Sequence, residues 1–365
     1  MANIHDVAKA AGVSIATVSA TLNESASVSE ETRRRVLAAV EAVGYAPNAI
    51  AQSLRRGKSR LIGLVIGDIS NPFSSTMART IEQGALAAGY SVIVCNTDDD
   101  ERRELHVIDQ LRTQRVAGII LTPVGKGPTY VRHLESRNLP PMVMVDQKVR
   151  GLHRDFVGVD NRVAARILTE YLIRLGHRRI AMICGRPGAW TSDERLAAFQ
   201  ATMADAGLPV DPSLCVPANY DGKMAYDATM LLMSRPDRPS GIIGANNFMA
   251  LAALQGVLDL GFRCPADVSI AGIDDVPWGG LVRPRITTAI QPVEEIASVA
   301  IAWLLERMAA GAASDAIAPR TQIFAPAMIV GGSCAPLTAA SEPSIDRAIA
   351  GTDAWTSPSP AKALV

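Results

Sequence analysis

The first twenty-two residues place apolar side chains at the spacing of two short helices joined by a tight turn. Gly12 suits the left-handed conformation that ends a helix, and Ser14 suits the N-cap of the helix that follows. The apolar positions are Ile4, Val7 and Ala8 in the first helix, and Val18 and Leu22 in the second. This pattern predicts a helix-turn-helix, whose second helix enters the major groove of DNA. The alternative is an ordinary αα-hairpin inside a protein core.

The predicted second helix carries small hydrogen-bonding side chains on its other face. These are Ser14, Thr17, Ser19 and Thr21. Hydroxyl groups of this kind bind phosphate oxygens and base edges of DNA. We therefore expect this face to be exposed, which favours a helix-turn-helix over a buried hairpin.

A third helix is expected from Ser29, as its N-cap, to Gly44, which ends it. It completes the small apolar core with a stripe formed by Val36, Leu37, Val40 and Val43. Arg33 to Arg35 follow its first turn. They could contact phosphate or form a solvated helix face, and the sequence favours neither.

Residues 47–57 have the signals of one more short helix, opened by Pro47 and closed by Gly57. Its large apolar residues are only Ile50 and Leu54, too few for a helix that is stable alone. Such a helix forms when it pairs with a twin or with DNA, where Leu54, beside Arg55, can wedge into the minor groove. The sequence of this segment fits a plain linker equally well.

From Leu61 the pattern changes to short apolar runs that alternate with amphipathic stretches. The runs are LIGLVIGDI, YSVIVCNT, VAGIILTP, PMVMVD, RIAMICG, GIIGANN and VSIAGIDD. Buried strands alternating with helices predict doubly wound parallel sheets, which bind ligands outside the carboxyl ends of their strands. The strands are too many for one compact lobe, so we expect two similar α/β lobes with a cleft between them. Residues 280–311 add a strand and a late amphipathic helix.

The expected organisation has four parts along the 365 residues. A helix-turn-helix domain covers 1–46 and a hinge or linker covers 47–59. A core covers 60–334, with lobe one at about 60–161 and 292–322 and lobe two at about 162–291 and 323–334. Residues 335–365 are rich in Ala, Ser, Pro and Thr, and we expect a disordered tail without a coiled coil.

Composition narrows the class of protein. With 48% apolar and 20% charged residues, no run of about 18 apolar residues and no secretory signal, the sequence predicts a soluble, cytoplasmic protein without a membrane association. Residues 1–60 hold eight Lys and Arg against five Asp and Glu, so a basic end of net charge +3 is joined to a body of net charge −3. This asymmetry fits a nucleic-acid contact at the N-terminal end.

No metal or cofactor is expected. The five cysteines are odd in number and scattered, and they form neither a disulfide framework nor a ligand pattern with the five histidines. The sequence also lacks the G-x-S-x-G, P-loop, H-E-x-x-H and G-x-G-x-x-G motifs, which argues against an enzyme. A solute-binding protein is a further alternative, which the absence of a secretory signal and the N-terminal module disfavour.

Taken together, these features resemble the LacI/GalR family of bacterial transcriptional repressors across roughly residues 2–334. The motifs that carry the resemblance are IHDVAKAAGVSIATVS, SEETRRRVLAAVEAVGYAPNAIAQSLRRG, IGLVIGDISNPF, VDN, LGHRRIAMICG, ERLAAF and GIDDVPW. The resemblance implies a homodimer that binds a pseudo-palindromic DNA operator, with a hinge helix and a core like that of periplasmic sugar-binding proteins. It also implies that Leu54 is the lever inserted at the operator's centre, which favours the hinge over the linker.

The resemblance carries DNA-binding roles onto positions of the helix-turn-helix and the hinge. These positions are Ser14, Ile15, Ala16, Thr17, Ser19, Asn23, Asn48, Leu54 and Arg55. Relatives often have arginine or another polar residue where this chain has Ala20. Because Ile15, Ala16 and Ala20 form no side-chain hydrogen bonds, we expect them to read bases by apolar contacts such as those with thymine methyl groups.

The resemblance places a small-molecule effector in the cleft. Polar effector positions match Asp146, Arg195, Asn246 and Asp274, and one guanidinium with two carboxylates suits a ligand rich in hydroxyls. Aromatic side chains near predicted loop ends could add flat surfaces, or could simply fill the cleft or core; they are Phe73, Trp190, Tyr220, Phe248 and Trp278. Asn247 stands where many relatives have aspartate, which removes one charge near the cleft.

We therefore expect a ligand-responsive regulator, in particular a repressor of carbohydrate uptake or catabolism genes. A sugar or sugar derivative is the preferred effector. A regulator that depends on a purine-type corepressor is the alternative.

Overall fold

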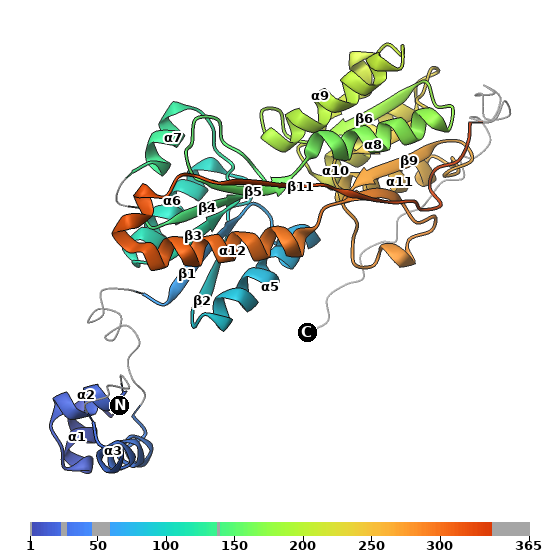
Figure 1. The fold of residues 1–365 in the computed structure, drawn as a ribbon. Coiled ribbons are helices and arrows are strands. Elements are labelled where there is room, and N and C mark those ends of the chain that lie inside the picture. Colours follow the sequence, from blue (N-terminus) through green and yellow to red (C-terminus); the bar gives the residue numbers. More distant parts are fainter. Residues whose placement is uncertain (1, 23–27, 46–58, 137–138, 338–365) are drawn as a thin grey trace, which may run out of the picture. The chain divides into compact units, whose positions relative to one another are not determined.

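The computed structural model describes residues 2–22, 28–45, 59–136 and 139–337, which fall into an N-terminal helical unit and an α/β unit (Figure 1). The helical unit contains α1 (Ile4–Ala11), α2 (Ile15–Leu22) and α3 (Glu30–Ala42). Val7, Val18 and Val36 are completely buried at its centre. The unit is thus held together by one apolar side chain from each helix and the small residues around them.

The turn between α1 and α2 forms as predicted. Gly12 adopts φ 62° and its N–H bonds to the carbonyl groups of Ala8 and Lys9, which ends α1. The hydroxyl of Ser14 accepts the N–H of Thr17 at 3.1 Å and so caps α2. One predicted core position is wrong: Leu37 is 50% exposed, and Ala39 is buried instead. At 100° per residue, position 39 turns with 36 toward the core while position 37 faces away.

The first lobe is built on a six-stranded sheet in the order β11-β5-β4-β3-β1-β2 (Figure 1). Its strands are β1 (Leu61–Ile66), β2 (Ser91–Asn96), β3 (Gly118–Leu121), β4 (Met142–Val145), β5 (Asp155–Val159) and β11 (Thr321–Phe324). Its helices are α5 (Pro72–Ala87), α6 (Glu101–Thr113), α7 (Pro128–Leu134) and α12 (Val293–Ala310). The long helix α12 packs on α5 and on β3 to β5.

The second lobe repeats the plan with a sheet in the order β12-β10-β9-β8-β6-β7. Its strands are β6 (Ile180–Cys184), β7 (Cys215–Pro217), β8 (Gly241–Gly244), β9 (Ser269–Ile273), β10 (Thr287–Ile290) and β12 (Ala327–Ile329). Its helices are α8 (Asn161–Arg174), α9 (Trp190–Asp205), α10 (Gly222–Met233) and α11 (Asn247–Asp259). Strand β12 pairs antiparallel with β10, whereas β8 pairs parallel with both β6 and β9.

The chain crosses between the lobes three times: after β5, after β10, and between β11 and β12 (Figure 1). The third crossing follows Phe324, two residues beyond the boundary expected from the sequence. Residues 335–337 also pack on the second lobe, since the N–H of Leu337 donates to the carbonyl of Leu175 at 2.8 Å. The remainder of the predicted tail lies outside the described residues.

Within the described part of the chain, no helix is both long and apolar enough to cross a bilayer. All five cysteines are free, with Cys184 buried and the other four partly buried. No group of three His, Cys, Asp or Glu in that part is arranged to hold a metal ion.

Candidate functional site

The N-terminal end of α2 presents the side chains expected to read DNA. Ser14 and Ala16 are exposed and Ile15 is 38% exposed, while Thr17 and Ser19 are half-buried. The hydroxyl groups of Ser14 and Thr17 lie 2.9 Å apart. The accessible surface of this helix start therefore combines hydroxyl groups with two apolar side chains.

The sequence predicted that Thr21 belongs to this exposed face, and that prediction is wrong. Thr21 is 2% exposed, and its hydroxyl donates to the carbonyl of Thr17 at 2.8 Å. A threonine one turn beyond Thr17 satisfies its hydroxyl within the helix and directs its methyl group inward. Thr21 therefore contributes to the core.

Arg35 has a structural contact of its own. Its Nη2 donates to the carbonyl of Ala11 at 2.7 Å, at the end of α1. A cation here stabilises the negative end of the helix and the turn that follows. The expected DNA-binding residues Asn23, Asn48, Leu54 and Arg55, with the hinge up to residue 58, lie outside the described residues.

The α/β unit contains a cavity of about 520 Å³ at the carboxyl ends of the strands of both sheets. This is where parallel sheets bind ligands. Six of the nine residues expected to bind an effector line it: Phe73, Asp146, Arg195, Tyr220, Asn246 and Asp274. They come from both lobes, so the structure brings together residues up to two hundred positions apart.

Arg195, on α9, is held in place from two sides. It is 3% exposed; its Nε donates to Oδ1 of Asn161 at 2.7 Å, and its Nη1 donates to the carbonyl of Ala245 at 2.6 Å. Its Nη2 donates to no residue that the structure describes. These two hydrogen bonds orient the buried guanidinium before any ligand binds, and its Nη2 can still donate to a ligand in the cavity.

Asp146 follows β4 and Asp274 follows β9, each at the end of its strand. Burial raises the pKa of Asp146 to about 6, although Arg195 opposes the shift, and it raises the pKa of Asp274 as well. The carboxylate of Asp274 accepts Nε2 of Gln291 at 2.9 Å. Both carboxyl groups therefore lack the solvation that a bound hydroxyl group could supply.

Backbone strain concentrates around the cavity. The described part of the chain holds seven non-glycine residues at positive φ, and six of them line the cavity: Asp98, Asp99, Asp146, Asn219, Tyr220 and Asp274. Such conformations cost free energy and persist where the surrounding structure imposes them. Their grouping here indicates a region shaped for binding.

The side of the cavity formed by the second lobe is a hydrogen-bonded network. Tyr220 and Thr191 place their hydroxyl oxygens 2.7 Å apart, and Gln147 donates Nε2 to Thr191 at 2.7 Å across the lobes. Asn246 caps α11, since its Oδ1 accepts the N–H of Met249 at 2.8 Å. Asn247 donates Nδ2 to Oδ1 of Asn71 at 3.2 Å, so the amide that stands in place of an aspartate links the lobes.

Several cavity residues were not expected from the sequence: Asp68, Asp99, Gln147, Arg186, Thr191 and Gln291. Most of them follow directly after a strand, as the three aspartates 98–100 do after β2. The same strand-end rule that identified Asp146 could have found them. Arg186 donates Nη1 to the carbonyl of Asp99 at 3.1 Å, which adds a third contact between the lobes to those of Gln147 and Asn247.

Three expected aromatic residues do not line this cavity. The ring of Trp190 packs edge-on against Phe156, at 5.4 Å between centroids, and faces a separate groove. Phe248 lies two residues beyond the cap of α11 and lines another groove together with Tyr226 of α10, and Trp278 is 49% exposed. A helix turns by about 100° per residue, so a side chain one or two positions after a cavity residue such as Asn246 points in a different direction.

Each of the two units matches a known protein family. Residues 3–48 match the family model of bacterial regulatory proteins of the lacI family, and residues 169–334 match the periplasmic binding protein-like domain. The chain is 32% identical over 308 residues to the ribose operon repressor of Escherichia coli (strain K12), covering 84% of this chain and 93% of that one. The HTH-type transcriptional repressor PurR of Aliivibrio salmonicida (strain LFI1238) is also 32% identical, over 84% of this chain and 92% of its own length.

A solved structure of the lac repressor dimer, bound to operator and the anti-inducer ONPF, shares the fold. It aligns with a TM-score of 0.80 at 24% sequence identity, over 92% of this chain and 99% of that one. The agreement covers the helical unit as well as the two-lobed core. The fold class expected from the sequence is therefore confirmed.

Proposed function

Because the chain belongs to the LacI family of bacterial regulatory proteins, we propose that it represses genes of carbohydrate uptake or catabolism under the control of a sugar-type effector. It is a ligand-responsive, DNA-binding transcriptional regulator, as its relatives of similar length are. The observation that carries the sugar proposal is the lining of the cavity. Arg195, Asp146, Asn246 and Asp274 combine fixed donors with acceptors around a space of about 520 Å³.

This combination suits vicinal hydroxyl groups, each of which donates one hydrogen bond and accepts others. A ligand without hydrogen-bond donors would leave the carboxylate of Asp146 without a partner, at a cost of about 1–3 kcal/mol. The name of one relative, the ribose operon repressor, also supports a sugar as the effector. We assign the effector-binding role to the six predicted residues that line the cavity, together with Gln147, Thr191 and Gln291.

In the proposed mechanism the protein acts as a homodimer on a pseudo-palindromic operator, with one helix-turn-helix in each half-site. An effector that contacts both lobes changes their relative angle. The hinge segment that leads into β1 transmits the change, because a short helix with few apolar residues is ordered only when it is paired. No catalytic step and no cofactor are part of this mechanism.

The first test is a thermal-shift screen of the full-length chain with pentoses, hexoses, sugar acids and nucleobases. A sugar that raises Tm should also change operator affinity in a fluorescence-anisotropy titration. Asp274→Asn should weaken that sugar at least about tenfold, because it removes a charged acceptor, and should leave the operator affinity without effector intact.

Asp275→Asn is the matched control for this experiment. Asp275 is the next residue in the chain, pairs with Arg285 at 2.9 Å, and is absent from the cavity lining. Equal sugar affinity in Asp274→Asn and wild type would exclude the cavity as the effector site. A response to nucleobases alone would replace the sugar by a purine-type effector.

The hinge has its own test. Leu54→Ala should abolish the preference for specific operator over random DNA, because the side chain that kinks the minor groove is lost. Non-specific binding should remain, with its strong dependence on salt. Specific affinity equal to wild type would contradict the lever role of Leu54.

A further inference from the structure

A second, larger groove of about 1140 Å³ lies beside the effector cavity. Three loops form it: 122–127 after β3 and 146–154 after β4 in the first lobe, and 185–189 after β6 in the second. It shares Pro123, Gln147 and Arg186 with the effector cavity, and the rest of its lining is its own. The groove therefore touches both lobes without being the same site.

The lining of this groove is strongly basic. Five of its cations form no ion pair with a carboxylate of the described residues: Lys126, Arg132, Lys148, Arg150 and Arg154. Its two acids are already engaged, since Asp193 accepts the N–H of Gly188 at 3.0 Å and Glu194 pairs with Arg162. Unpaired like charges around one concave surface repel one another and attract an anion.

Individual contacts hold some of these cations in place. Nζ of Lys148 lies 5.6 Å from the centre of the Phe156 ring. Arg154 donates Nη2 to the carbonyl of Leu134 at 3.1 Å, while its buried Nε has no partner among the described residues. These contacts fix the positions of two of the five cations.

Lys126 brings its charge from the first lobe to the second. Its Nζ donates to the carbonyl of Pro187 at 3.4 Å, and a Cβ atom added at Gly188 would collide with it. Trp190, at the start of α9, adds a half-buried ring, and its indole N–H has no partner among the described residues. The groove thus offers cations, a flat apolar wall and a neutral donor.

We propose that this groove binds a small phosphate ester as a second ligand, separate from the effector. A phosphate dianion takes several cationic donors at once, and the organic part of the ester would lie on the ring of Trp190. The five unpaired cations belong to the first lobe and Trp190 belongs to the second, so a ligand that contacts both stabilises one angle between the lobes. It therefore couples energetically to the effector, and each ligand changes the affinity of the other by the same factor.

The experiment is calorimetric titration of the full-length chain at low salt with glucose 6-phosphate, AMP and inorganic phosphate. Glucose and adenosine serve as unphosphorylated counterparts. We expect a phosphate ester to bind with a Kd below about 1 mM, at least tenfold more tightly than its counterpart. The three phosphates distinguish a sugar ester, a nucleotide and free phosphate as the source of the anion.

The variant that tests the site is Lys148→Gln with Arg150→Gln, which should weaken the phosphate ester at least tenfold. The control is Arg174→Gln with Lys223→Gln, two exposed cations outside the groove that remove the same charge. Equal weakening by both pairs would reduce the effect to net charge and overturn the site. The absence of phosphate binding up to 10 mM, a concentration about tenfold above the expected Kd, would overturn it too.

Asp274→Asn separates this inference from the proposed function. It should retain phosphate binding while losing the sugar response. If Asp274→Asn lost the phosphate ester and the groove variant kept it, the ester would occupy the effector cavity and the second site would be refuted. If sugars failed in every variant while the groove still bound phosphate, only the sugar proposal would fall.

Discussion

Asp146 and Asp155 lie on adjacent strands of the first sheet, one at the carboxyl end and the other at the amino end, and their carboxylates have very different surroundings. Asp155 begins β5 and is 1% exposed. Its oxygens accept Nε and Nη2 of Arg307 at 2.9 and 2.6 Å, and the N–H and Nη2 of Arg320 at 2.8 and 3.1 Å. Burial raises the pKa of Asp155, but these hydrogen bonds outweigh burial and bring it below its ordinary value.

Asp146 follows the adjacent strand β4 and accepts no side-chain hydrogen bond from any described residue. It has a positive φ of 62°, and burial raises its pKa to about 6. At the carboxyl end of the strands, Asp146 is strained and poorly solvated, whereas at the amino end the hydrogen bonds of Asp155 are complete. The two ends of the sheet therefore serve different purposes, ligand binding and folding. The amino ends of the strands stabilise the lobe, and the carboxyl ends keep polar groups available for a ligand.

The largest change in stability should come from removing the main hydrogen-bond partner of Asp155. Arg307→Met leaves Asp155 buried without its main partner, and we expect a loss of about 3–5 kcal/mol in the free energy of unfolding. Urea denaturation followed by circular dichroism measures it. The double variant Asp155→Leu with Arg307→Met removes both charges and should be less destabilised than the single one. A single variant within 1 kcal/mol of wild type would contradict the contrast, because breaking a buried pair costs far more.

The opposite sign is expected at the cavity. Asp146→Asn removes a carboxylate that is poorly solvated in the folded state, so it should stabilise the protein without effector at pH 8. The pKa difference of about two units corresponds to at most about 3 kcal/mol, and solvent in the cavity reduces this to about 1–2 kcal/mol. The same variant should bind the effector more weakly. A destabilised Asp146→Asn would show that the carboxylate serves folding after all.

The pH dependence sharpens the same comparison. The folded-state pKa of Asp146 lies above the ordinary value of about 4, so its protonated form stabilises the fold below pH 4 and this contribution is lost as the pH rises through about 6. Asp155 behaves in the reverse way, because its stabilisation is present above about pH 4 and is lost in acid. The stability gap between Asp146→Asn and wild type should therefore grow from near zero at pH 4 to its maximum above pH 6.

Sequence patterns predicted most of the sheet but missed some of its strands, including β5, for a reason that Asp155 illustrates. Strands such as β1 and β4 are continuous apolar runs, buried on both faces. Strand β5 is equally buried but begins with an aspartate whose partners, Arg307 and Arg320, are about 150 residues away. The strands β7, β11 and β12 are partly or largely exposed, and each is only three or four residues long.

Cavity residues could be predicted where they directly follow a strand that is recognisable in the sequence. Asp146, Asn246 and Asp274 each follow an apolar run in the sequence, and each lines the cavity. The direction of a side chain on the helix that follows was not predictable, because it depends on the rotation set by the cap. Phe248 and Trp190 belong to such helix starts, and both face away from the cavity.

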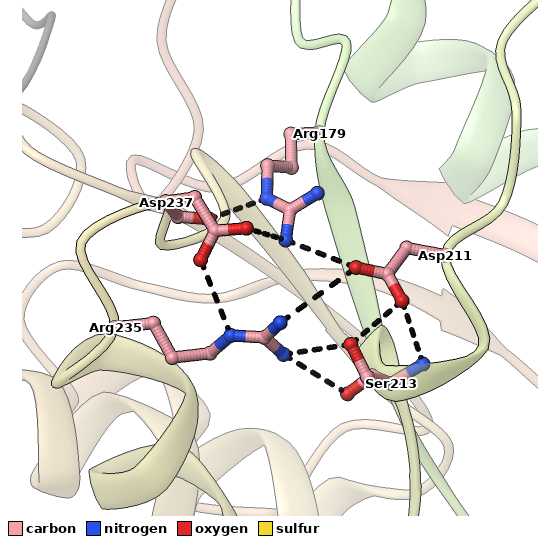
Figure 2. Close-up of polar contacts among 5 residues, drawn as sticks. All are labelled: Arg179, Asp211, Ser213, Arg235 and Asp237. Carbon is pink, nitrogen blue, oxygen red and sulfur yellow. Dashed lines mark hydrogen bonds and ion pairs between the residues drawn. The ribbon is translucent and has the colours of Figure 1, made fainter.

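The smallest effect is expected at a third kind of carboxylate, which is paired with arginines but only partly buried. Figure 2 shows Asp211 and Asp237 of the second lobe joined by Arg179 and Arg235. Hydrogen bonds from Ser213 are the main reason that the pKa of Asp211 falls to about 2. This network resembles the surroundings of Asp155 in its pairing, although its four side chains are 31–59% exposed.

Arg235→Gln tests whether pairing or burial decides the outcome. Water replaces a lost partner at the surface, so we expect Tm to change by no more than about 2 °C, and less in high salt. Arg307→Met, measured in the same thermal scan, supplies the buried reference. A loss in Arg235→Gln as large as in Arg307→Met would mean that completeness of pairing alone stabilises the lobes. In that case the contrast between Asp155 and Asp146 would owe nothing to the depth at which Asp155 is buried.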